Sequence, residues 1–325
     1  MRKLARVPLG ARRTAKASAF IAAITVCCLV AAQGTSYATP QDPAPADNSG
    51  QDVTDALSTV GIKVLPDGWI EYKSMLRSVG ASGEMSRVAG TREEDGGCTL
   101  PGSDETPPDS SRTTFTEEVA YNPATCEFDI LVADLTTSQA ADLNAMSDAD
   151  PSDVSSTGDA ATSDETGVVA PAATTYSRYL KTSWIDPINI TISSQKVGLK
   201  WTSSSWRNWA YKRDSFKGCI GGVCLDKTYI YSSSDSFSTL SNGWKKTANV
   251  HFRNTSFALW VVAILGPTGW AACGFPTSSR ADFYHKDSVT GYKNGGSAWS
   301  WSDSKSGACT NLVHHGKQTG ASYPF

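Results

Sequence analysis

The sequence predicts a mainly β protein, in which a C-terminal antiparallel β-sandwich follows a small α+β domain and a disordered linker. Residues 175–325 contain short runs rich in Tyr, Trp, Val, Ile and Thr, separated by Gly, Ser, Asn and Pro. Runs at this spacing are typical of antiparallel sandwiches and barrels. Residues 146–174 are mostly Ser, Thr, Asp and Ala. Such a segment buries too little apolar surface to offset the entropy of ordering it, which predicts a linker.

The charge distribution changes at this linker. Residues 39–174 carry 25 acidic and 6 basic side chains, whereas residues 176–325 carry 17 basic and 7 acidic ones. No glutamate follows Glu165. We therefore expect an acidic α+β domain at residues 52–145 and a basic, aromatic-rich β-sandwich domain at residues 175–325.

The N-terminus has the three regions of a secretory signal peptide over residues 1–38. Basic residues come first, an apolar stretch follows at residues 19–32, and Ser36-Tyr37-Ala38 offers a cleavage site. The apolar stretch of about 14 residues is shorter than the roughly 20 that span a bilayer, so we expect no stable membrane span. We predict a secreted protein; Arg12-Arg13 leaves the general and twin-arginine routes open. Residues 39–51 are expected to be disordered.

Within residues 52–145 the pattern predicts four local structures. A short helix is expected at 53–60, a bent strand pair at 62–73 around Pro66-Asp67-Gly68, and a helix at 137–144 capped by Thr136 or Thr137. A hairpin is expected at 113–135, because apolar residues recur with period two on both sides of Asn122-Pro123-Ala124-Thr125.

In the C-terminal half we expect strands at 176–184, 188–202, 206–213, 227–232, 246–254, 257–265, 281–292, 298–303 and 310–315. The run Phe257–Leu265 has nine apolar residues ended by Gly266-Pro267. It is interpreted as a strand buried on both faces, with a membrane-inserting segment as the alternative.

Six cysteines follow the signal peptide, an even number that favours disulfides in an exported protein. Proximity along the chain selects Cys98–Cys126, Cys219–Cys224 and Cys273–Cys309. A zinc site of Cys219, Cys224, Cys309 and His314 is the alternative. We expect no cofactor and no metal.

No nucleophile elbow, zinc-protease, P-loop or dinucleotide motif occurs in the chain. An extracellular hydrolase remains an alternative function. It would have to draw on four histidines and seven aspartates, and His285 with Asp287 and a nearby serine is the first candidate triad. These candidates are His251, His285, His314, His315, Asp186, Asp214, Asp226, Asp235, Asp282, Asp287 and Asp303.

Aromatic and basic residues alternate in one segment of the basic half. Aromatic faces stack on sugars or bases and cations hold anionic groups, so we predict a non-catalytic protein that binds a cell surface or an anionic polymer such as the cell wall. The acidic N-terminal region would mask this surface. Two alternatives stay open: that the tryptophans fill the core, and that the Ser/Thr-rich run Lys227–Leu240 belongs to a pore-forming or toxin-like protein. The predicted binding residues are Trp201, Trp206, Arg207, Trp209, Tyr211, Lys212 and Arg213.

Several segments together resemble a group of secreted proteins. These are the signal peptide, the linker, the run Tyr121–Cys126 and the stretch from Gly307 to His315. In these features the chain is similar to uncharacterised exported proteins of streptomycete-type actinobacteria. The resemblance implies export and brings no activity to these residues.

Overall fold

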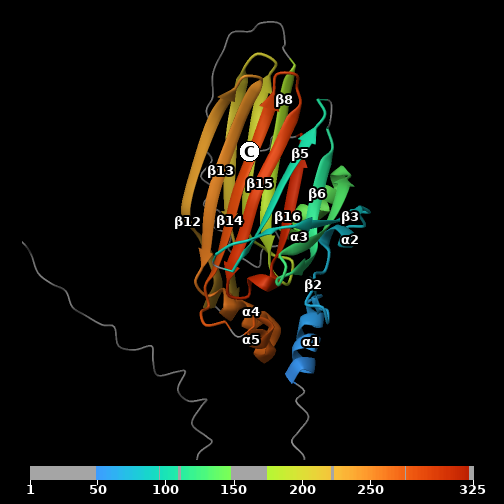
Figure 1. Cartoon of the computed structure of the whole chain (residues 1–325), viewed down its shortest axis with the longest axis vertical. Helices are drawn as coiled ribbons and strands as arrows, with labels where there is room; N and C mark the ends of the chain where they lie inside the picture. The colour runs from blue at the N-terminus through green and yellow to red at the C-terminus, as the bar shows by residue number, and fades with distance from the viewer. Residues whose placement is uncertain are drawn as a thin grey trace, which may run out of the picture. The chain divides into compact units, whose positions relative to one another are not determined.

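Two antiparallel β-sheets face each other, and each contains strands from both halves of the sequence (Figure 1). This is a computed structural model, and it describes residues 49–94, 96–108, 111–147, 174–220, 223–274 and 276–321. The predicted signal peptide at 1–38, the segment 39–48 and most of the linker lie outside the described residues. The mainly β class is confirmed.

The first sheet runs in the order β1-β2-β6-β16-β8-β9-β10, and β7 pairs with both β6 and β3. In each strand alternate residues face the second sheet, as the pleat requires. The strands are β1 (Lys63–Val64), β2 (Ile70–Glu71), β3 (Glu84–Ala89), β6 (Thr113–Asn122), β7 (Glu127–Leu135), β8 (Thr175–Ile185), β9 (Thr191–Thr202), β10 (Trp206–Ser215) and β16 (His314–Gly320).

The second sheet runs in the order β11-β12-β13-β14-β15-β5-β4. Its four long strands, β12 to β15, form antiparallel ladders; short turns join β12 to β13 and β14 to β15, whereas the connection from β13 to β14 spans residues 255–280 and contains helices. The strands are β4 (Thr91–Arg92), β5 (Cys98–Thr106), β11 (Lys217–Ile220), β12 (Val223–Leu240), β13 (Gly243–Asn254), β14 (Ala281–Tyr292) and β15 (Ser297–Gly307).

The acidic and basic halves share both sheets. In the second sheet β5 pairs with β15 over nine residues, from Cys98 opposite Lys305 to Thr106 opposite Ser297. In the first sheet β6 pairs with β16, with Glu117 opposite Gly316. The expected boundary at the linker therefore does not separate two sets of strands. The change of charge at the linker is a feature of the sequence alone, because strands from the acidic and the basic segments pair with each other. Pairing between segments far apart in the chain leaves no local sequence pattern from which it could be predicted.

The local predictions for residues 52–145 are confirmed. Helix α1 covers Ser49–Thr59, β1 and β2 form the bent pair, and β6 and β7 form the hairpin. Helix α3 covers Thr137–Ser147, and the Thr136 hydroxyl accepts from the Gln139 N–H at 3.2 Å, as a capping residue does. The short helix α2 (Met75–Ser78) and the strands β3, β4 and β5 were not predicted.

The segment Phe257–Leu265 is helix α4, so the predicted strand there is wrong. A short apolar run does not distinguish a buried strand from a helix. The helix buries one side, including Phe257 and Val261, and leaves Leu259 46% exposed. It ends at Gly266, whose φ of 69° a residue with a Cβ adopts only with strain. A 3-10 turn η1 (Gly266–Thr268) and helix α5 (Gly269–Ala272) follow.

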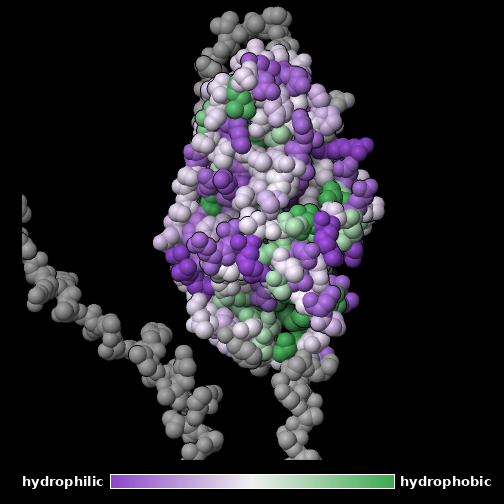
Figure 2. All heavy atoms as spheres, in the orientation of Figure 1, coloured by the Kyte–Doolittle hydropathy of each residue, from purple (hydrophilic) through white to green (hydrophobic). Residues whose placement is uncertain are grey.

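Helix α4 lies at one end of the two sheets, where apolar residues gather on the surface (Figures 1 and 2). The Phe257 ring meets the Phe283 ring edge to face, with centroids 5.6 Å apart. No helix within the described ranges is long and apolar enough to cross a bilayer. The expected strand at 310–315 is also corrected: Thr310–Leu312 form a 3-10 turn, and β16 begins at His314.

Two of the three predicted disulfides are confirmed. Cys98–Cys126 joins β5 to the β6–β7 turn, and Cys273–Cys309 joins the end of α5 to the turn after β15. The second bridge removes Cys309 from the alternative zinc site, because a disulfide sulfur is no thiolate ligand. Cys219 and Cys224 are opposite each other in the β11–β12 register. Their side chains lie outside those described.

Candidate functional site

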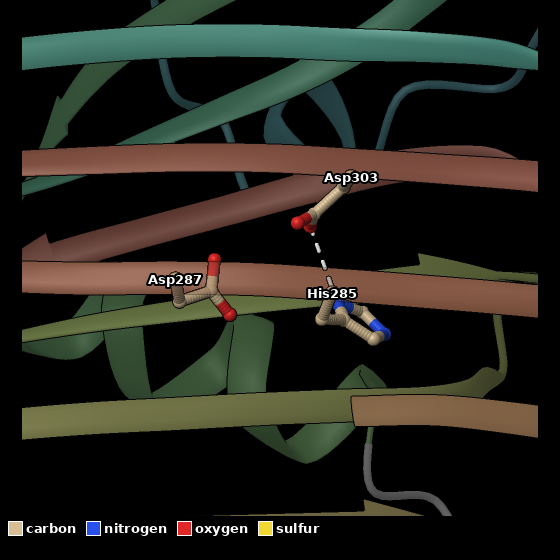
Figure 3. Close-up of side chains that lie close together, drawn as sticks. All are labelled: His285, Asp287 and Asp303. Atoms are coloured by element: carbon tan, nitrogen blue, oxygen red, sulfur yellow. Dashed lines mark hydrogen bonds and ion pairs between the residues drawn. The ribbon is translucent and has the colours of Figure 1, made fainter. Parts of the chain in front are cut away.

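A cluster of ionisable side chains lies buried between the two sheets. His285 and Asp287 are two residues apart on β14 and so share its inner face. The β14–β15 register pairs Tyr284 with Ser304 and Asp287 with Trp301, which brings Asp303 beside them. In Figure 3 the carboxylate of Asp303 points toward the imidazole of His285. All three residues are at most 1% exposed.

The first sheet supplies the remaining partners of this cluster. The Thr182 hydroxyl lies 2.7 Å from His285 Nδ1 and 2.8 Å from Asp287 Oδ2. The Gln195 amide donates to the same Asp287 oxygen at 2.9 Å. His315 Nε2 lies 2.8 Å from Asp303 Oδ2. The cluster therefore joins the sheets by hydrogen bonds across their interface, and it lies between apolar residues such as Phe283 and Val289 on the same strand.

The two aspartates are driven to opposite protonation states. Burial and the negative charge of Asp303 raise the pKa of Asp287 well above its ordinary value. Burial also opposes ionisation of Asp303, but attraction to His285 and His315 outweighs it and holds the pKa of Asp303 well below its usual range. Asp303 is thus the more acidic member of the pair, and Asp287 is the member that holds a proton more strongly.

Three residues of the cluster have the hydrogen-bond order of a serine triad. Ser193 Oγ lies 3.2 Å from His285 Nε2, and His285 Nδ1 lies 3.2 Å from Asp303 Oδ2. The predicted triad named His285 with Asp287, so the sequence identified the histidine but not the aspartate that faces it. Since Ser193 is 0% exposed, no substrate reaches its hydroxyl in this conformation.

The same residues could hold a metal ion. The ligand atoms of His285, Asp287 and Asp303 all lie within 4.8 Å of one another. Asp287 Oδ1 has no hydrogen-bond partner within the described residues. The other ligand atoms already have partners on the first sheet, so an ion would have to displace Thr182 and Ser193.

A second buried ion pair lies beside the cluster. Lys305 Nζ is 3.3 Å from Glu118 Oε1, and Glu118 also accepts from the backbone N–H of His315 at 3.1 Å. Burial lowers the pKa of Lys305, and burial raises the pKa of Glu118 against the attraction of that lysine. The ammonium also lies 4.4 Å from the centre of the Tyr121 ring. This pair ties β15 to β6 across the interface.

The other two candidate histidines lie apart from the cluster. His251 pairs with Asp282 at 2.6 Å, and Arg253 and Arg280 bind the same carboxylate. His314 stacks on Tyr72, and burial, then the charges of Lys305 and His315, lower the pKa of His314 to about 3. It is neutral at pH 7, so its 3.8 Å approach to Glu117 is not an ion pair.

The other candidate aspartates do not join the cluster. Asp186 accepts from Trp260, and Asp214 and Asp235 pair with lysines. The side chain of Asp226 lies outside those described.

The predicted aromatic and basic residues do not share one exposed face. Trp201 is fully buried and donates to the Tyr292 carbonyl at 2.8 Å. Arg213 is 5% exposed and bonds carbonyls of the second sheet. Trp206, Trp209 and Tyr211 are partly buried against residues that include Phe237 and Lys246. The exposed members are Arg207 and Lys212.

The outer face of the first sheet carries a lysine row that sequence analysis missed. Lys181 on β8 is directly opposite Lys196 on β9, and Lys196 is directly opposite Lys212 on β10. We call these three residues the lysine row. Lys200, four residues after Lys196, is exposed on the same face of β9. Only the strand register reveals the row, because its members are 15 and 16 positions apart.

A cleft lies between β5 and β15 of the second sheet on one side and the hairpin β6–β7 of the first sheet on the other. Its volume is about 750 Å³, and Trp299, Trp301 and Lys317 lie on its walls. Trp301 precedes Asp303 by two positions on β15, and Lys317 follows His315 by two positions on β16, so the cleft lies next to the buried cluster.

No family model, no curated protein and no solved structure matches this chain.

Proposed function

We propose that this protein is secreted and binds an anionic polymer, such as a cell-wall polymer, through the lysine row on the outer face of the first sheet. The observation that carries the proposal is the direct opposition of Lys181, Lys196 and Lys212 on three adjacent strands. Like charges in directly opposite positions destabilise a sheet. An anionic ligand across the strands would relieve that repulsion.

The electrostatics of the row support this. Burial and the charges of Lys181 and Lys212 lower the pKa of Lys196 to about 8. A bound polyanion would stabilise the charged form and raise that pKa again. Asp214, which pairs with Lys212 at 3.2 Å, is the acidic residue beside the row. With Lys200, the described side chains here place four cations beside this carboxylate. Lys181 lies next to Leu143 and Asn144 of α3, and the exposed members of the set are Lys200 and Lys212.

Export is supported independently of binding. Disulfides form and persist in oxidising compartments, and Cys98–Cys126 and Cys273–Cys309 are two such bridges. The N-terminal sequence has the order of a signal peptide. Both features agree with a target outside the cytoplasm.

The binding experiment uses the full secreted chain and immobilised wall teichoic acid. We expect retention at low salt that falls steeply as salt rises, because phosphate contacts release counterions. Replacing Lys181, Lys196 and Lys212 together by Gln should remove most of the retention. The matched control replaces three lysines that are exposed elsewhere on the surface, Lys63, Lys286 and Lys293. Equal retention of the two triple variants would contradict the proposal.

The acidic linker adds a regulatory part to the proposal. Residues 146–174 contain acidic side chains and no basic one, and they connect α3 to β8, which carries Lys181. A tethered segment acts at an effective concentration in the millimolar range, so it would compete with an external polyanion. In the same assay, protein cleaved within the linker should bind more tightly than intact protein. Equal binding by the cleaved and the intact protein would contradict masking by the linker.

A further inference from the structure

The cleft beside the buried cluster has walls from both sheets. One wall consists of β5 and β15, with Leu100, Trp299 and Trp301. The opposite wall consists of β3, β6, β7 and the end of β16, with Ile130 and Lys317 among its residues. A volume of about 750 Å³ is within the range of small-ligand sites.

Two tryptophans two positions apart on β15 face the cleft. Trp301 is directly opposite Gly102 on β5, and a Cβ added at Gly102 would lie only 1.8 Å from the indole ring. The glycine therefore allows the ring to lie flat over β5. Lys317 Nζ lies 4.0 Å from the centre of the same ring, on the side of the first sheet.

The indole N–H groups of both tryptophans lack a hydrogen-bond partner among the described residues. Trp299 is only 5% exposed, and a buried indole N–H is normally bonded. Leaving such a donor unpaired is unfavourable. A ligand with acceptor oxygens close to the rings would satisfy both donors.

Two ion pairs lie at the walls, one of them, Arg112–Asp134, exposed to solvent. Lys317 pairs with Asp104, and Arg112 pairs with Asp134 at 2.8 Å while Thr114 donates to the same carboxylate. Each pair places a donor beside an acceptor, which matches two neighbouring hydroxyl groups of a sugar ring. With Glu105 the cleft has three carboxylates and two cations, so an anionic polymer is disfavoured there.

We propose that this cleft binds a neutral saccharide chain, with a sugar ring against Trp301 and its hydroxyl groups at the Asp104–Lys317 pair. Flat aromatic rings, paired charges and unpaired indole donors are what an uncharged polyhydroxylated ligand would use. The site is separate from the lysine row, which faces outward from β8, β9 and β10. The protein would thus bind two chemistries at two places, a polyanion and a neutral glycan.

The test titrates the full chain with four neutral probes, chitotetraose, cellotetraose, maltotetraose and mannotetraose, and follows tryptophan fluorescence and heat of binding. We expect one of them to bind with a Kd of about 1 mM or tighter. Trp299→Phe and Trp301→Phe keep an aromatic ring but lose the N–H, and each should weaken binding roughly fivefold. Gly102→Ala should abolish it by displacing the Trp301 ring.

Two controls separate the cleft from other causes. Trp270→Phe changes a tryptophan of α5, which does not line the cleft, and should leave the Kd unchanged. The Gln variant of the lysine row should lose teichoic acid binding and keep saccharide binding. No binding of any probe, or equal weakening by Trp270→Phe and Trp301→Phe, would overturn the saccharide site while leaving the proposed polyanion surface intact.

Discussion

The opposite protonation states of Asp287 and Asp303 lead to a sharp prediction about two conservative substitutions. Asp303 is 0% exposed and faces His285 at 3.2 Å and His315 at 2.8 Å. Removing one partner of a buried ionic group costs about 3–5 kcal/mol. We expect Asp303→Asn to lower the free energy of unfolding by about that amount.

Asp287→Asn should behave differently. The raised pKa of Asp287 favours its protonated form, and its Oδ2 accepts from Thr182 and Gln195. The amide oxygen of an asparagine can accept the same two hydrogen bonds, so this substitution should change the free energy of unfolding by less than about 1 kcal/mol near pH 4 and below, where the aspartate is largely protonated in the unfolded chain as well. Because the pKa is raised in the folded state, Asp287 lowers stability progressively as pH rises above about 4, where the unfolded aspartate ionises. Over that pH range the free energy of unfolding of the asparagine variant should rise relative to that of the native protein.

The assay is urea unfolding of the oxidised, full-length protein, followed by tryptophan fluorescence at several pH values. The m-value should stay the same in both variants, so that the midpoint reports stability. Equal destabilisation by the two substitutions would refute the assignment of the charge to Asp303. So would a larger destabilisation by Asp287→Asn than by Asp303→Asn.

Two further predictions concern other buried elements. Burial lowers the pKa of His314 to about 3, so the free energy of unfolding should fall by about 1.4 kcal/mol per unit as pH drops from about 6.5 to about 3. His314→Phe should remove this part of the pH dependence while keeping the stack on Tyr72. Parallel pH profiles of the variant and the native protein in urea unfolding would contradict this prediction. In α4, Phe257→Ala should cost about 3–5 kcal/mol, whereas Leu259→Lys should stay within about 0.5 kcal/mol because Leu259 is exposed. Severe destabilisation by Leu259→Lys in thermal unfolding would argue for burial on both faces.

Much of the local structure is determined by short-range patterns. The hairpin 113–135 and the capped helix at 137 follow from period-two alternation and a threonine cap, which act over a few residues. The two confirmed disulfides span 28 and 36 residues and follow from the even number of cysteines and their order along the chain. Helix α4 was missed because nine consecutive apolar residues have no period to read. Which of these apolar residues is exposed, as Leu259 is, depends on how the helix packs on the end of the sheets and cannot be seen in the sequence.

Long-range register determined the rest. Sequence alone established the mainly β class and the change of charge at the linker, and it named His285 only as one of four candidate histidines. Only the tertiary structure placed β5 and β6 of the acidic half inside sheets built by the basic half. It also placed Asp303 beside His285 and aligned Lys181, Lys196 and Lys212. Strand pairing aligns residues far apart in the chain through backbone hydrogen bonds that every residue type can make, so these juxtapositions leave no signature in the sequence.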